Sequence, residues 1–313
     1  MKQQAIIIKL KPIDWITLIF CFWMLLLIGF GWNRVHNPLP IFIGYFTIVA
    51  AILLLIWFKE FMKEQSKPEN CPSEVCKVVR PKIYNAVSFV RSYYPVTLYL
   101  FFFLSVSVTN KVFFSDWLDP FFQSIDFAIF GYLPSMEWGM RFDNIWLKEW
   151  IYFSYFSYYL MIIWLPVIFY RRQREAMDEM VFILSFVFYF CYFIFSWLPV
   201  VGGRYIPLAM EMTRQANGGI FTAIMAFIYT NSPHMGGAFP SSHIAIALVL
   251  SLLAFKYFRK LGYLFLFLTT FLSFATVYCH YHWFIDAVFG VLTGFLGYWV
   301  AQVLFRKLSE RTK

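Results

Sequence analysis

The chain has 313 residues, of which 61% are hydrophobic, 23% aromatic and 14% charged, whereas roughly 25% of the residues in a typical soluble domain are charged. Folding alone cannot hide this much apolar surface from water, which excludes an ordinary soluble protein and makes lipid the expected solvent. The formal net charge of +9 does not predict nucleic-acid binding. The basic residues lie mainly in short segments between apolar stretches, as topology signals and contacts with anionic lipid headgroups do.

Eight apolar stretches predict membrane-spanning helices, each of which needs about 20 mostly apolar residues. The predicted spans are residues 13–31, 39–58, 95–114, 149–170, 180–198, 242–258, 262–279 and 284–304. The segment 115–148 is acidic and amphipathic, and we expect it to form helices on the membrane surface rather than a ninth span. The sequence therefore predicts an all-α, polytopic transmembrane helix bundle.

Basic residues concentrate in alternate connecting segments. Twenty of the 26 Lys and Arg residues lie in the two terminal tails, the loop from Lys59 to Arg91, the segment after the fourth span and the turn after the sixth. The positive-inside rule places these segments in the cytoplasm. We therefore expect an integral protein of a plasma or inner membrane, with both termini cytoplasmic and residues 199–241 and 280–283 external.

A Pro-Ser-Ser-His string stands where the sixth predicted span begins, at residues 240–243. A helix N-terminus presents unpaired backbone N–H groups and a positive dipole end, which together favour a phosphate group. The amides and hydroxyls of Ser241 and Ser242 are candidate phosphate ligands, and His243 falls in the first turn beside them. The same string also serves as an ordinary helix cap.

His282 and Asp286 are four residues apart, which places them on one face of a helix. A carboxylate bonded to one imidazole nitrogen fixes the tautomer and leaves the other nitrogen free to attack an electrophile. Asp286 is the only acidic residue of the last predicted span, and an intramembrane carboxylate requires a partner. The pair is either a nucleophile with its orienting carboxylate or a structural hydrogen bond.

Arg204 follows two glycines at the start of the third external segment. It is either a phosphate ligand or an interfacial anchor. It shares the external side with both histidine motifs, which favours a phosphoryl-transfer site at the outer mouth of the bundle. Of the other histidines, we expect His280 to have an interfacial or supporting role, His234 to belong to loop structure and His36 to be interfacial.

These motifs resemble those of the type 2 phosphatidic acid phosphatase superfamily, a group of membrane lipid phosphatases and phosphotransferases. The Pro-Ser-Gly-His signature of that family is similar to residues 240–243, and its signature of Ser-Arg, then His and an Asp four residues later is similar to Ala275, Thr276, His282 and Asp286. The serine and the arginine are replaced here, and the first family signature, Lys-x6-Arg-Pro, is absent. The string 202–205 and His280 resemble the branch of inositol phosphorylceramide synthases.

The resemblance covers about residues 95–305 and implies a catalytic domain over 95–313 with a six-helix core. It leaves residues 1–94 as two further transmembrane helices with a basic loop. It also implies a phospholipid or lipid-phosphate substrate, with no metal, no cofactor and no nucleic-acid partner. A non-catalytic lipid-binding or lipid-transport protein with a degenerate site is the alternative.

The resemblance also implies a mechanism through a phosphohistidine. His282 attacks phosphorus, Asp286 orients His282, and His243 protonates the leaving oxygen. The implied phosphate ligands are Arg204, Tyr205, Ser241 and Ser242, with Arg214 as a second candidate cation.

Overall fold

The computed structural model describes residues 10–71, 73–215, 218–231 and 234–312. Within them the chain forms α-helices, three short 3-10 helices and no strand, which confirms the all-α prediction. The helices are α1 (Pro12–Phe30), α2 (Pro38–Gln65), η1 (Pro68–Asn70), α3 (Glu74–Thr109), α4 (Asp119–Phe130), α5 (Pro134–Arg141), α6 (Ile145–Arg172), η2 (Arg174–Ala176), α7 (Met177–Trp197), η3 (Gly203–Tyr205), α8 (Pro207–Gln215), α9 (Ile220–Asn231), α10 (Ser242–Tyr257), α11 (Arg259–Tyr278) and α12 (Phe284–Thr312).

Seven helices in the described part of the chain are long and apolar enough to cross a membrane, so this is a multi-pass membrane protein. They are α1, α2, α3, α6, α7, α11 and α12. The sixth predicted span differs, because α10 has 16 residues and is therefore about 24 Å long. The hydrocarbon core is about 30 Å thick. One end of α10 must therefore lie inside the apolar layer.

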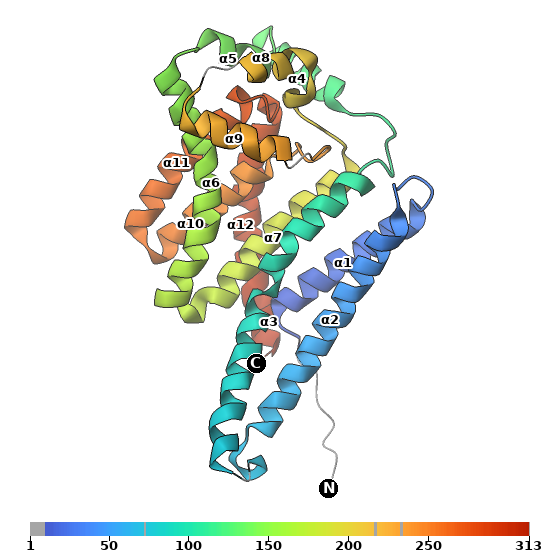
Figure 1. Ribbon diagram of the computed structural model, residues 1–313, viewed down its shortest axis with the longest axis vertical. Coiled ribbons are helices and arrows are strands. Elements are labelled where there is room, and N and C mark those ends of the chain that lie inside the picture. Colours follow the sequence, from blue (N-terminus) through green and yellow to red (C-terminus); the bar gives the residue numbers. More distant parts are fainter. Residues whose placement is uncertain (1–9, 72, 216–217, 232–233, 313) are drawn as a thin grey trace.

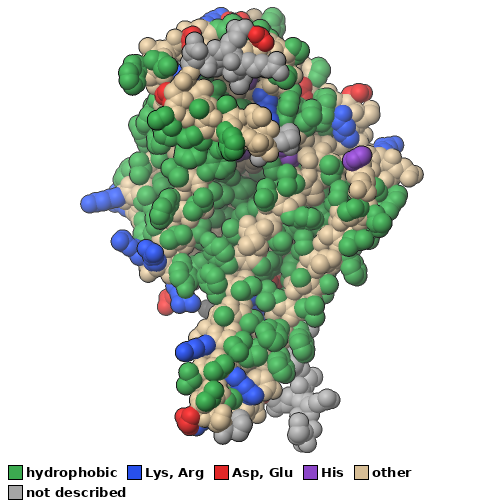
Figure 2. Space-filling view, in the orientation of Figure 1, with side chains coloured by type: hydrophobic (Ala, Val, Ile, Leu, Met, Phe, Trp, Pro, Cys, Tyr) green, Lys and Arg blue, Asp and Glu red, His purple; other side chains and the backbone are tan. Residues whose placement is uncertain are grey.

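The bundle is built around α10, which packs against α6, α7, α11 and α12. Figure 1 shows α4, α5 and α8 lying across one end of the bundle, which we call the capped end. The start of α1 and the end of α12 lie toward the opposite end, which we call the basic end. On the face shown in Figure 2, hydrophobic side chains cover the middle of the molecule, and Lys and Arg side chains lie both below them, toward the basic end, and above them, at the capped end.

The predicted basic loop between the second and third spans is largely helical. Helix α2 runs 28 residues and α3 runs 36 residues, so only 66–73 separate them. Lys and Glu are good helix formers, so a polar stretch does not end a helix by itself. The Ser73 hydroxyl also caps α3 by accepting from the Cys76 amide at 3.2 Å. The predicted boundary between 1–94 and 95–313 falls inside α3, and this division stays a prediction.

Candidate active site

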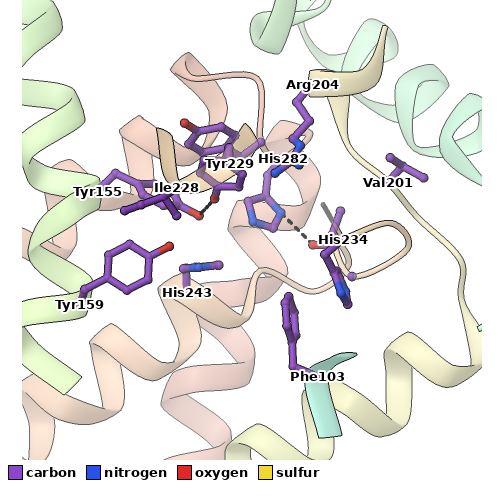
Figure 3. Close-up of a pocket in the computed structure, with 13 residues that line it drawn as sticks. Phe103, Tyr155, Tyr159, Val201, Arg204, Ile228, Tyr229, His234, His243 and His282 are labelled. Atoms are coloured by element: carbon purple, nitrogen blue, oxygen red, sulfur yellow. Dashed lines mark hydrogen bonds between the residues drawn. The ribbon is translucent and has the colours of Figure 1, made fainter. Parts of the chain in front are cut away.

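A cavity of about 120 Å³ lies beneath the helices of the capped end, lined by residues of α3, α6, η3, α9 and α10 and of the segments that precede η3, α10 and α12. Three of the five histidines in the chain line it, together with one arginine and four tyrosines (Figure 3). These residues are His234, His243, His282, Arg204, Tyr155, Tyr159, Tyr229 and Tyr281. The structure thus brings the three predicted motifs, far apart in sequence, to one cavity.

His282 lies in the turn between α11 and α12, where its amide donates to the Thr276 carbonyl at 3.0 Å. Its Nδ1 is 2.8 Å from the carbonyl oxygen of Ala238. A carbonyl oxygen only accepts, so Nδ1 carries the proton and Nε2 keeps its lone pair. Burial, together with the Arg204 charge, lowers the pKa of His282 to about 4 against the opposing effect of the Ala238 hydrogen bond. At neutral pH the imidazole is therefore neutral, and the unprotonated Nε2, the candidate nucleophile, lies 3.2 Å from the Ser241 hydroxyl.

Asp286 does not make the predicted hydrogen bond to His282. Its Oδ2 lies 3.6 Å from His282 Nδ1 and instead accepts from the Trp283 amide at 2.9 Å. Trp283 directly precedes α12, and an acidic side chain in the first turn commonly accepts from the amide of the residue before the helix. The Ala238 carbonyl, rather than the carboxylate, therefore fixes the tautomer of His282. Asp286 is fully buried, and its Oδ1 has no hydrogen-bond partner among the residues that the structure describes.

The two histidine motifs are joined through their main chains. The Ser241 amide donates to the Asp286 carbonyl at 3.0 Å, and the Ser241 hydroxyl lies 3.2 Å from His282 Nε2. The ring of His243, in the first turn of α10, is centred 6.3 Å from that of His282. The Ser241 amide is thus not available to a phosphate as predicted, and Ser242 is buried without lining the cavity.

Arg204 enters the cavity from η3 between two tyrosine rings, centred 4.5 Å (Tyr205) and 4.3 Å (Tyr229) from its guanidinium carbon. Its Nη2 donates to the Tyr205 hydroxyl at 2.6 Å. A larger cavity, of about 380 Å³, adjoins the first and shares Arg204 and Tyr229 with it, and Tyr205 lines this second cavity. Arg204 therefore stands between the two cavities. The side chain of Arg214 lies outside the described part of the structure.

His280 is not among the residues that line the cavity. Its backbone has a positive φ of 64°, and its Nδ1–H donates to the Ser135 carbonyl at the start of α5. Burial lowers the pKa of His280, which keeps the ring neutral. His280 thus attaches α5 to the turn that carries His282. His36 is exposed in the connection between α1 and α2.

Two aspartates of α4, which no motif in the sequence marks, hold the Arg204 and His282 segments in place. Asp119 accepts from the Val201 amide at 3.0 Å, the Gly202 amide at 2.8 Å and the Trp283 indole N–H at 2.8 Å. Asp126 accepts from the amides of Phe284 and Ile285 at 2.7 and 3.0 Å, and so caps α12. The two carboxylates are seven residues apart, or two helical turns, and share one face of α4. In the sequence, two aspartates seven residues apart in an amphipathic segment were the pattern from which this role could have been predicted.

Gly202 allows the Arg204 segment to approach the His282 turn. Its φ is +83°, a conformation that side chains with a Cβ rarely adopt. A Cβ at this position would also collide with the Tyr281 carbonyl oxygen. The two segments can therefore lie in contact only because residue 202 has no side chain.

We expect Asp119→Asn to reduce turnover by about 10- to 100-fold, because an amide cannot satisfy three donors and hydrogen bonds to charged groups contribute about 1.5–3 kcal/mol each. Trp283→Phe, which removes one of the donors, should cost less, and the two changes should be strongly non-additive. Asp116→Asn, at an exposed position of the same segment, is the control. The measurement is phosphate release by purified variants whose thermal unfolding is followed in parallel. Additive effects of Asp119→Asn and Trp283→Phe would contradict the shared hydrogen bond.

The comparisons with known proteins agree with this geometry. The family model of the PAP2 superfamily matches residues 131–300, which is more than half of the chain and includes Arg204, His243, His282 and Asp286. No curated protein and no solved structure matches. Helices α1 to α4 precede the matched region, so the Asp119 and Asp126 clamp lies outside it. The chain belongs to the PAP2 superfamily, whose members are generally phosphatases.

Proposed function

We propose that this protein is an integral membrane lipid phosphatase or phosphotransferase that works through a phosphohistidine at His282. One observation carries the proposal. His282 Nδ1 lies 2.8 Å from the Ala238 carbonyl, which leaves Nε2 unprotonated, and the His282 ring lines a cavity that Arg204 and His243 also line. A nucleophile, a cation and a second imidazole are the groups that phosphoryl transfer without a metal requires.

The reaction has two steps. In the first, His282 Nε2 forms a bond to phosphorus while the bond from phosphorus to the leaving oxygen breaks, and His243 gives that oxygen a proton. Arg204 binds the equatorial oxygens, where charge is concentrated in the transition state. In the second, His243 takes a proton from water or from an alcohol, whose oxygen then displaces His282 from phosphorus. Asp286 is buried 3.6 Å from Nδ1 and stabilises positive charge on His282.

A lipid substrate fits the setting of the cavity. Helices α3 and α6, which cross the membrane, contribute Phe103, Tyr155 and Tyr159 to its wall. A phosphate carried on a membrane lipid therefore reaches this depth without leaving the bilayer. The basic residues at the opposite end of the bundle support a cytoplasmic location for the termini and an external location for the cavity. Two sequence features favour the branch of inositol phosphorylceramide synthases within the family. They are the string Gly202-Gly203-Arg204-Tyr205 and the threonine at position 276.

The test is to incubate the detergent-purified chain with a panel of lipid phosphates and phospholipids, with and without inositol or glycerol, and to identify the products by mass spectrometry. Release of phosphate without an alcohol identifies a phosphatase, and a new headgroup identifies a phosphotransferase. His282→Ala is the control for contaminating activity. A wild-type chain that binds lipid phosphates but converts none of them would contradict the proposal and favour a lipid-binding protein.

A further inference from the structure

His234 forms part of the cavity wall although it lies outside the motifs described above. Its ring stacks on Phe103 of α3, with the ring centroids 3.6 Å apart and the planes inclined by 14° (Figure 3). A Cβ at residue 237 would lie 2.5 Å from His234 Nε2, so the glycine leaves room for the ring. The ring is therefore held in one orientation by its surroundings.

Neither ring nitrogen of His234 has a hydrogen-bond partner in the described structure, and both are buried. Leaving a buried donor or acceptor unpaired costs about 1–3 kcal/mol, and native proteins leave few such groups without an explanation. Burial, with smaller contributions from the nearby Arg204 and His243, lowers the pKa of His234 to about 3. The ring is neutral, so it offers one N–H donor and one acceptor rather than a positive charge.

The position of His234 is tied to that of Arg204. The Tyr205 hydroxyl accepts from Arg204 Nη2 at 2.6 Å and donates to the His234 carbonyl at 3.2 Å. Tyr205 thus couples the guanidinium to the segment that carries the imidazole. Arg204 and His234 both line the cavity that His243 and His282 also line.

Apart from Arg204, the side chains of the cavity that could donate to an anion are uncharged, namely the hydroxyls of its four tyrosines and the histidine rings. Arg204 is the single Lys or Arg among its described lining residues. Thr276 is buried, and its hydroxyl donates to the Ser273 carbonyl at 2.8 Å inside α11. The Ser241 amide is also occupied, by the Asp286 carbonyl. A phosphate in this cavity therefore requires donors beyond Arg204.

We propose that His234 is a further phosphate ligand, whose ring N–H donates to a non-bridging oxygen of the phosphate that Arg204 and His282 also contact. The inference rests on the proposed function in one respect, that the cavity binds a phosphate. It replaces the expectation that His234 belongs to loop structure. His234 binds and positions the phosphate as a neutral donor, and His243 alone exchanges a proton with the reacting oxygens.

His234→Phe tests this contact, because phenylalanine keeps an aromatic ring on Phe103 and removes both nitrogens. His234→Gln restores one N–H donor without the ring, and His36→Phe is the matched control at an exposed histidine. The dissociation constant of inorganic phosphate is measured by calorimetry on the full-length chain in detergent, together with kcat/KM for a lipid phosphate and the thermal midpoint.

We expect His234→Phe to weaken phosphate binding by about 10- to 100-fold, the range for one hydrogen bond to a charged group. The value of kcat/KM should fall by a similar factor, and His234→Gln should recover part of both losses. The thermal midpoint of His234→Phe should equal or exceed that of the wild type, because two buried, unpaired nitrogens are removed. His36→Phe should match the wild type in every measurement.

An unchanged phosphate affinity in His234→Phe would overturn the inference. So would a lowered thermal midpoint in both variants with no recovery in His234→Gln, which indicates a packing role, or a wild-type chain that binds no phosphate. A wild-type chain that binds phosphate in a His234-dependent manner but shows no turnover would support this ligand and contradict the proposed function.

Discussion

His282→Ala should abolish both turnover and the formation of a covalent phosphoenzyme, with a loss in kcat of about 10⁴-fold or more, as for other covalent nucleophiles. Removing His282 removes the ring whose Nε2 is left unprotonated by the Ala238 hydrogen bond and which lines one cavity with Arg204 and His243. The expected intermediate is a phosphoramidate, labile in acid and stable in base. Labelling from a radiolabelled lipid phosphate, followed by acid or base treatment, measures it.

Two controls separate this loss from misfolding. His36→Ala makes the same change at an exposed site and should label as the wild type does. His280→Ala removes the hydrogen bond to the Ser135 carbonyl and should weaken the attachment of α5 while keeping the label. Acid-labile, base-stable label that persists in His282→Ala would contradict the assignment and move the nucleophile to His243 or His280.

His243→Ala should slow transfer by about 10²- to 10⁴-fold from a lipid phosphate, whose alkoxide is a poor leaving group. An aryl phosphate, whose leaving oxygen needs little protonation, should lose far less. The difference follows from the position of His243, whose ring lies 6.3 Å from that of His282 across the cavity. This spacing leaves room for a phosphoryl group between the two imidazoles.

The measurement compares kcat/KM of His243→Ala and wild type on one alkyl and one aryl phosphate. The phosphoenzyme should still form in the variant from the aryl substrate, because the attacking nitrogen is intact. Equal losses on the two substrates would show that His243 binds the phosphate rather than protonates the leaving oxygen.

The sequence predicted the fold well because the thickness of the bilayer sets the length of each apolar segment that crosses it. Seven of the predicted spans correspond to helices long enough to cross, and the position of the eighth is confirmed although α10 is short. The sequence was a poor guide to where helices end in polar segments, as at α2 and α3. Lys and Glu in these segments are good helix formers, so their polarity did not show whether the helix continues or ends.

The gathering of His243, His282 and Arg204 was also predictable, because sidedness follows from counting spans. Their hydrogen-bond partners were not. The Ala238 carbonyl that fixes the tautomer of His282 belongs to the main chain, which carries no signal in the residue type. The tyrosines that line the cavity looked like membrane-interface aromatics, since both roles use the same side chain. Asp119 and Asp126 could be assigned only once α4 had a position.

The long α2–α3 hairpin has a practical consequence for imaging. At 1.5 Å per residue, the 36 residues of α3 extend about 54 Å, well beyond the roughly 30 Å of hydrocarbon that they cross. Figure 1 shows α2 and α3 reaching past the rest of the bundle at the basic end. In a detergent micelle, this rod protrudes from an otherwise featureless belt. It gives single-particle images of a small membrane protein a landmark for alignment, and an antibody fragment raised against its tip would leave the candidate active site uncovered.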